Sequence, residues 1–178
     1  ESVLKKTLKT DARSLTEVQY RKALLASLAA AAIGYNAHFA NVVAAFFAAC
    51  GQDLAQVAEA AMGITCIESR GPEGVYMSVY LPDVPLGAIG GGTTLGTQRE
   101  ALEIMGVVVD DDNVGRAVLR LAEILGATVL AGELSLMSAF TSRDLARAHA
   151  ELGRGDGATR ALALPLATGR VCAWGRSR

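Results

Sequence analysis

Aromatic side chains make up only 5% of this 178-residue chain, although hydrophobic residues of all kinds make up 51% of it. A core with so few aromatic rings has to be built from alanine, leucine and valine. Small side chains allow helices to approach one another closely, so we expect tightly packed helices or an interface between subunits. The chain is long enough to bury a real core, and its length predicts a single domain.

The chain has almost no net charge, because 17 basic residues nearly balance 18 acidic ones to give −1. This balance excludes the basic surface that proteins use to bind nucleic acid. Cysteine is scarce, and Cys50, Cys66 and Cys172 form no CxxC pair and no metal-ligand spacing with His38 and His149. We therefore expect free thiols in a reducing compartment and no metal site.

No signal peptide and no long apolar run are visible in this sequence. Residues 23–33 form the longest apolar run, which is too short to cross a bilayer. The first residue is glutamate rather than methionine, so we expect a fragment of a longer polypeptide.

The hydrophobic periodicity predicts an α+β domain in which helices outnumber strands. Residues 64–68 and 75–81 are expected to form an antiparallel hairpin, followed by an extended piece at 84–89. Residues 153–178 are rich in glycine and arginine and lack periodicity, so we predict a poorly ordered tail. The expected helices cover residues 16–33, 37–50, 53–61, 97–106, 114–140 and 142–152, after a short helix end at 2–9.

The most informative segment is GYNAHFANVVAAFFAACGQD, residues 34–53. An apolar helix is expected to carry His38 and Asn41, which are three residues apart and would share one face. A buried imidazole or amide needs hydrogen-bond partners. The two side chains are satisfied core groups or parts of a ligand site, and this segment alone favours the first explanation.

Two glycine-linked features could take part in chemistry. Gly90–Thr93 (GGGT), between an extended segment and a helix, could bring backbone close to an anionic ligand or simply form a tight turn. Asp53, just after Gly51, could be a reactive carboxylate or only a helix cap. Taken alone, the structural explanation is favoured for each of them.

For two charged or ionisable side chains, His149 and Lys22, a role in chemistry and a purely structural role are again both possible. His149 could donate a proton near neutral pH, or lie on the surface of the last helix. Lys22 could anchor a substrate carboxylate as a point charge, or extend from an apolar helix face into solvent. The order and context of these features decide between the explanations.

From residue 16 to about 152 the chain resembles the C-terminal part of the catalytic domain of 3-hydroxy-3-methylglutaryl-coenzyme A (HMG-CoA) reductases. Chance would not place GYNAH, GQD, GGGT and GELSLM in this order. The resemblance implies a helix-rich part of the family's substrate-binding (large) domain at 1–152, followed by the tail at 153–178. The matching segments are EVQYRK (17–22), IGYNAHFANVV (33–43), ACGQD (49–53), GITCIE (63–68), LGAIGGGTTL (86–95), AGELSLMSA (131–139) and LARAH (145–149).

The resemblance implies reduction of HMG-CoA to mevalonate and free coenzyme A, through a hemithioacetal, with two hydrides from NADPH or NADH. NADPH is the expected cofactor. By the same resemblance, His149 protonates the departing coenzyme A thiolate, whose pKa lies above neutrality. Asp53 is then the catalytic aspartate that sets the protonation of a neighbouring lysine and glutamate. The residues expected near the nicotinamide are Gly90, Gly91, Gly92 and Thr93.

The resemblance also assigns residues to the substrate. Lys22 and Asn41 would hold the hydroxymethylglutaryl group, and Lys9 would meet the coenzyme A phosphates, although the match before residue 16 is looser. An apolar wall beside the substrate would consist of Leu136, Ala139 and Phe140.

The chain departs from the family pattern in one important way. The family's catalytic glutamate, its catalytic lysine and its main nucleotide-binding domain precede the matched region, so we expect the isolated chain to be inactive. The alternative is a catalytically incomplete acyl-coenzyme A-binding or oligomerisation module, because the small-residue helices suit a homodimer or tetramer with shared active sites. No serine follows His149 until Ser177, as in soluble prokaryotic members. We therefore expect a cytoplasmic protein, or one at the cytosolic face of the endoplasmic reticulum if an anchor lies upstream.

Overall fold

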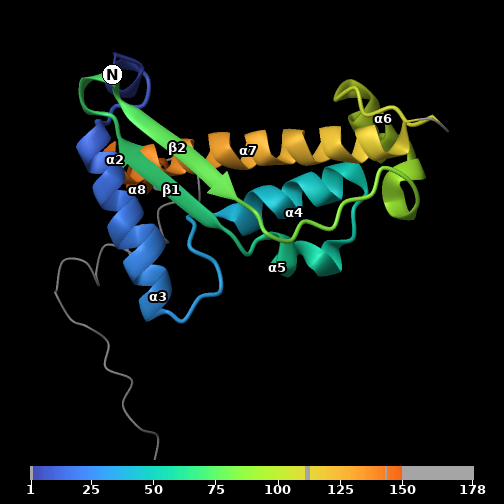
Figure 1. Ribbon diagram of the computed structural model, residues 1–178, viewed down its shortest axis with the longest axis horizontal. Coiled ribbons are helices and arrows are strands. Elements are labelled where there is room, and N and C mark those ends of the chain that lie inside the picture. The colour runs from blue at the N-terminus through green and yellow to red at the C-terminus, as the bar shows by residue number, and fades with distance from the viewer. Residues whose placement is uncertain (1, 111–112, 143, 150–178) are drawn as a thin grey trace, which may run out of the picture. The chain divides into compact units, whose positions relative to one another are not determined.

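The computed structural model describes residues 2–110, 113–142 and 144–149 (Figure 1). They belong to two compact units, residues 1–141 and residues 142–178, and each unit is described by itself. The tail predicted at 153–178 lies outside the described residues. In the described part of the chain, helices outnumber the strands of a single small sheet, which agrees with the α+β class predicted from the sequence.

The first unit begins with α1 (Ser2–Lys6), followed by one helical stretch made of α2, the π-helical η1 and α3. Asp11 caps this stretch, because its carboxylate accepts hydrogen bonds from the Ser14 N–H at 2.9 Å and the Ser14 hydroxyl at 2.8 Å. The bounds of the three segments are Ala12–Val18, Gln19–Ala26 and Ser27–Ala29.

The N-terminal helical stretch ends earlier than the predicted residue 33. Ala31 adopts a left-handed conformation, with φ of 52°. The N–H of Ala32 then donates to the carbonyl of Ser27 at 2.9 Å, a closure that commonly ends a helix. The alanine run was predicted to remain helical because alanine is the best helix former, but local propensity did not decide where this helix ends.

The central helix, α4 (Phe39–Cys50), ends at Gly51, which has a φ of 69°. The prediction that His38 lies inside this helix is wrong. His38 precedes the first turn, with φ of −160° and ψ of 35°. The Asn36 side chain accepts from the Phe39 N–H at 3.1 Å, so the helix begins at Phe39, two residues later than predicted. His38 therefore does not share a helical face with Asn41.

The predicted hairpin is confirmed. β1 (Ile64–Ser69) and β2 (Val75–Tyr80) pair antiparallel, with Ile64 opposite Tyr80 and Ser69 opposite Val75. The next segment, residues 82–90, packs Ala88 into the core but forms no strand in the described part of the chain. The turns and short helices around the hairpin are η2 (Leu54–Gln56), α5 (Val57–Ala60), η3 (Gly71–Glu73), η4 (Gly91–Thr94) and α6 (Gly96–Ile104).

The long helix α7 (Val114–Ser142) confirms the prediction that the helix starting at 114 continues through its small-residue segment. By length and composition alone, α7 could cross a membrane, which the sequence reading did not anticipate. Its row of Leu121, Leu125 and Val129 is buried in the core, and core helices of soluble proteins have the same composition. The helix therefore does not by itself indicate a membrane span. In the second unit, α8 (Asp144–Ala148) precedes His149.

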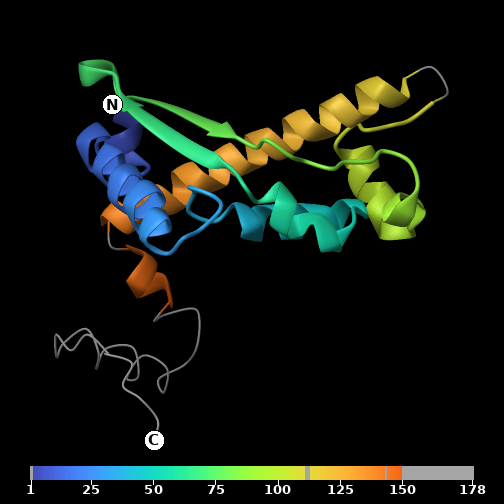
Figure 2. The ribbon, with the colours of Figure 1, turned by 60° about the horizontal axis from the view of Figure 1, so that its bottom comes forward.

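Two hydrophobic clusters lie along α7. In Figures 1 and 2, α4 runs beside α7, and the N-terminal helices and the hairpin lie toward the end of α7 nearer residue 137. The first cluster joins α7 to α4, α5 and α6, and its large buried members include Phe39, Phe47, Leu102, Leu121 and Leu125. The second joins α7 to the N-terminal helices and β1, and it contains Leu4, Leu15, Ala23, Ile67 and Met137.

Candidate functional site

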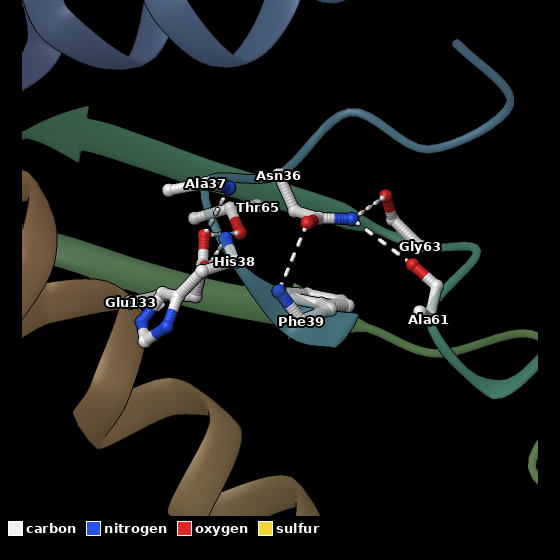
Figure 3. A network of polar contacts seen from close by, with 8 residues as sticks. All are labelled: Asn36, Ala37, His38, Phe39, Ala61, Gly63, Thr65 and Glu133. Atoms are coloured by element: carbon white, nitrogen blue, oxygen red, sulfur yellow. Dashed lines mark hydrogen bonds and ion pairs between the residues drawn. The ribbon is translucent and has the colours of Figure 1, made fainter. Parts of the chain in front are cut away.

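A buried carboxylate on α7, Glu133, fixes the N-terminal end of α4 (Figure 3). Its exposed fraction is 0%, and it accepts hydrogen bonds from the N–H groups of Ala37 at 2.9 Å and His38 at 2.7 Å. It also accepts a 2.6 Å hydrogen bond from the Thr65 hydroxyl on β1. A charge is tolerated inside a protein when hydrogen bonds replace its hydration. One side chain thus joins α7, β1 and the entry to α4.

Asn36 holds the same turn from its other side (Figure 3). Its amide nitrogen donates to the carbonyls of Ala61 at 3.1 Å and Gly63 at 3.2 Å. Its amide oxygen accepts from the Phe39 N–H at 3.1 Å, which is the cap that starts α4. The GYNAH segment is therefore a turn bonded on two sides rather than the beginning of a helix.

The imidazole of His38 packs against α7 at Gly132. A Cβ built on Gly132 would lie 3.1 Å from Cγ2 of Val42 and 3.3 Å from both Cε1 and Nε2 of His38, so a larger residue would require these side chains to shift by a few tenths of an ångström. Nε2 is buried, lies 3.9 Å from a Glu133 oxygen and has no hydrogen-bond partner within the residues that the structure describes. Asn41, in the first turn of α4, is exposed.

At the other end of α4, the turn Gly51–Asp53 meets the glycine loop. The N–H of Gly92 donates to the carbonyl of Gly51 at 3.2 Å. A Cβ on Gly51 would lie only 2.4 Å from the carbonyl carbon and oxygen of Gly92, and the φ of Gly51 is already 69°. Two backbones approach this closely only when side chains are absent, so this contact requires glycine.

Gln52 makes a second bond between these segments. Its amide nitrogen donates to the carbonyl of Gly87 at 2.9 Å, and its amide oxygen accepts from the Gly87 N–H at 2.8 Å. The same nitrogen also donates to the carbonyl of Cys50 at 3.1 Å. The side chain of Gln52 therefore pairs with the Gly87 backbone as a neighbouring strand would.

These contacts form a pocket of about 260 Å³ that is lined by Asp53 together with Gly90, Gly91 and Thr93. Asp53 is exposed and also caps η2, because its carboxylate accepts from the Ala55 N–H at 2.9 Å. A Cβ on Gly90 would meet nothing within 4 Å, so the space above the loop is open. A flat group could approach the loop backbone there, beside a carboxylate.

A second cleft, of about 380 Å³, brings Lys22 of η1 together with Phe140 near the end of α7. The hydroxyl of Thr141, which also lines this cleft, donates to the Thr10 hydroxyl at 2.6 Å. That bond fastens the segment that carries Lys9, an exposed residue with a φ of 52°. Further residues on the walls of the cleft are Ser14, Glu17, Val18 and Arg21.

The structure does not bring all of the predicted site residues into one pocket. Asn41 and Asp53 lie at opposite ends of α4, whose 12 residues span roughly 18 Å. Leu136 and Ala139 are half-buried on α7, ahead of Phe140. His149 is an exposed residue of the second unit. In the described part of the chain, no three side chains of the kinds that bind metals gather around a common point.

Sequence reasoning missed Glu133 and Gln52. A signal for Glu133 existed, because it continues the buried row of residues four apart that includes Leu125, Val129 and Met137. For Gln52 the only local signal was its place between Gly51 and Asp53. Its partner lies 35 residues away and cannot be found from spacing.

The sequence model of the family described as hydroxymethylglutaryl-coenzyme A reductase matches residues 1–154. Three proteins named 3-hydroxy-3-methylglutaryl-coenzyme A reductase are similar to the chain. That of Aeropyrum pernix is 51% identical over 153 residues, which are 86% of this chain and 36% of the relative. That of Pyrococcus horikoshii is 48% identical over 152 residues, 85% of this chain and 37% of the relative. That of Xenopus laevis is 40% identical over 151 residues, 83% of this chain and 17% of the relative.

The chain therefore belongs to the HMG-CoA reductase family. It spans little more than a third of the length of the archaeal relatives.

Proposed function

We propose that the polypeptide containing this chain reduces HMG-CoA to mevalonate and free coenzyme A, with two hydrides from NADPH or, less favoured, NADH. Residues 1–152 would be the C-terminal part of its catalytic domain, within the substrate-binding domain. Family membership supports this proposal. The structural observation that carries it is that Asp53 lines one pocket with Gly90, Gly91 and Thr93.

The residues of this pocket fit a nicotinamide coenzyme, which supplies hydride when bound. The open space above Gly90 lets a flat ring lie against the backbone, and Gly92 permits the close contact that shapes the loop. Asp53 is placed to influence proton transfer to the substrate oxygen as charge develops there. An exposed carboxylate can also hold a cationic side chain that supports that oxygen.

The Lys22 cleft suits the acyl part of the substrate. The ammonium group of Lys22 would bind the terminal carboxylate of the hydroxymethylglutaryl group, and Asn41 would bind its polar oxygens. Lys9, fastened near the cleft through the Thr10–Thr141 bond, would meet the coenzyme A phosphates. The apolar wall would consist of Leu136, Ala139 and Phe140.

His149 would protonate the coenzyme A thiolate as it leaves, because the pKa of an ordinary thiol lies above neutral pH and the released thiolate therefore takes up a proton. We also propose a cytoplasmic homo-oligomer with shared active sites. The separation of Asn41 and Asp53 along α4 supports this part, because one substrate could reach both groups if they came from neighbouring subunits.

The test uses the full-length product of the gene that encodes this chain. Oxidation of NADPH or NADH is followed with HMG-CoA, and released coenzyme A is measured with a thiol reagent. We expect two coenzymes oxidised per thiol released. Asp53→Asn and His149→Ala should each lower kcat by about 100-fold or more, the scale of a lost acid or base. The matched control is Asp83→Asn, an exposed carboxylate outside the pocket.

A folded full-length protein that binds HMG-CoA but oxidises neither coenzyme would contradict the proposed reaction. Unchanged turnover in His149→Ala would contradict only the role given to that residue.

A further inference from the structure

Gly51 and Gln52, the two residues before Asp53, bind opposite ends of the segment 87–92. The Gly51 carbonyl accepts from the Gly92 N–H at 3.2 Å, and the Gln52 amide pairs with both backbone groups of Gly87. Ile89, Gly90 and Gly91, between these two anchors, line the pocket, and the space above Gly90 is open. The two anchors therefore hold the shape of the pocket wall.

Only one orientation of the Gln52 amide satisfies its surroundings. Its nitrogen faces two carbonyl oxygens, those of Gly87 and Cys50, and its oxygen faces the Gly87 N–H. The reversed amide would place oxygen against two acceptors and nitrogen against a donor. A glutamate at this position would have the same conflict, because an ionised carboxylate donates nothing.

Among the residues that the structure describes, Asp53 is connected to the loop through its neighbours. The Asp53 carboxylate accepts a hydrogen bond from the Ala55 N–H, inside its own turn. The hydrogen bonds that fix the distance between this turn and the loop are made by Gly51 and Gln52. A shift of about 1 Å in a reacting group can lower a rate by about 100-fold, so such bonds matter for catalysis.

We infer that Gln52 is a positioning residue for the reductase reaction, because its amide holds Asp53 at a fixed distance from the glycine loop. This inference rests on the proposed function. Gln52 itself lines the pocket, but its amide is already bonded to the backbone of Gly87 and Cys50. The side chain therefore acts through Asp53 and through Gly87.

The test compares the full-length wild type with Gln52→Met, which keeps the length of the side chain and removes its hydrogen bonds. The control is Gln98→Met, on α6 and outside the pocket. Three quantities are measured: kcat for NADPH oxidation with HMG-CoA, the dissociation constant of HMG-CoA by calorimetry, and the hydrogen-exchange rate of the Gly87 amide. The last two do not depend on turnover.

For Gln52→Met we expect kcat to fall at least tenfold and the Gly87 amide to exchange at least tenfold faster. The dissociation constant of HMG-CoA should stay within twofold, because the Lys22 cleft is separate. A merely structural role would instead weaken HMG-CoA binding and lower kcat together, or speed exchange of the Gly87 amide and leave kcat unchanged. Gln98→Met should match the wild type in all three.

If Gln52→Met does not fold, Gln52→Asn replaces it, since the shorter amide cannot reach both groups of Gly87. A folded variant at Gln52 with kcat within twofold of wild type, in a wild type that oxidises coenzyme, overturns this inference and leaves the proposed function standing. A wild type that oxidises no coenzyme overturns both.

Discussion

The hydroxyl of Thr65 donates a 2.6 Å hydrogen bond to the carboxylate of Glu133, 68 residues later in the chain, and both residues are fully buried. This bond joins β1 to α7. The carbonyl of Thr65 also accepts from the buried amide of Gln19 at 3.0 Å, which extends the connection to η1. Three parts of the first unit therefore meet at one threonine and one carboxylate.

Glu133→Ala should lower the free energy of unfolding by about 3–5 kcal/mol, because it leaves the N–H groups of Ala37 and His38 and the Thr65 hydroxyl without their acceptor. Thr65→Val removes one of these bonds and should cost about 1–2 kcal/mol. Urea unfolding measures both. The control Glu123→Ala changes an exposed carboxylate on the same helix. A cost for Glu133→Ala no larger than for this control would be incompatible with the network.

Gly51→Ala should destabilise the protein much more than Gly71→Ala, although both glycines have positive φ. At Gly71 a Cβ meets nothing within 4 Å, so only the backbone conformation is penalised, by about 1–2 kcal/mol. At Gly51 the Cβ would also collide with Gly92 at 2.4 Å. Thermal unfolding compares the two variants, and equal losses would mean that Gly51 and Gly92 are not in close contact.

Hydrogen bonds from the Ser14 N–H and hydroxyl hold the pKa of Asp11 below its usual range. A carboxyl group with a lowered pKa in the folded protein stabilises that protein at neutral pH, and the contribution is lost as pH falls through the folded pKa. Asp11→Ala should therefore cost about 1 kcal/mol at pH 7 and progressively less below about pH 4. Urea unfolding at pH 7 and at a pH below about 4 tests this, with Asp83→Ala as the control. A cost that did not shrink in acid would refute the cap.

Burial raises the pKa of the Cys50 thiol, whereas Cys66 is exposed. Only the thiolate reacts with alkylating reagents, so iodoacetamide should modify Cys66 quickly in the native protein. Cys50 should react roughly 100-fold more slowly, at the rate of local opening. The experiment is cleanest in a Cys172→Ser background, with modified sites identified by mass spectrometry. Equal rates in the folded protein would place Cys50 at the surface.

Elements set by local periodicity could be predicted from the sequence. The long helix α7 follows from apolar residues four apart, and the hairpin follows from alternation on both sides of a Gly-Pro turn. The position of His38 could not be predicted in this way. Asn36 and Glu133 determine where α4 begins, and Glu133 lies 95 residues away from His38 in sequence.

The candidate site was predicted from motifs, and the roles assigned to its residues stay predictions. The structure places Asp53 and Gly90 on the wall of one pocket, although they are distant in sequence. Glu133 was overlooked because a carboxylate in a helix is usually exposed, and its burial depends on donors from other segments. The role of His149 stays a prediction.

Because α7 passes through both hydrophobic clusters, neither cluster can melt without loosening the helix that supports the other. Phe140, near the C-terminal end of α7, lines the Lys22 cleft. Leu121, nearer the N-terminal end of α7, belongs to the hydrophobic cluster that also contains Ala88, just before the glycine loop. The Lys22 cleft and the glycine-loop pocket are therefore supported by the same helix, α7, and the stability of one is linked to the stability of the other. A ligand held at either region would slow amide exchange at both.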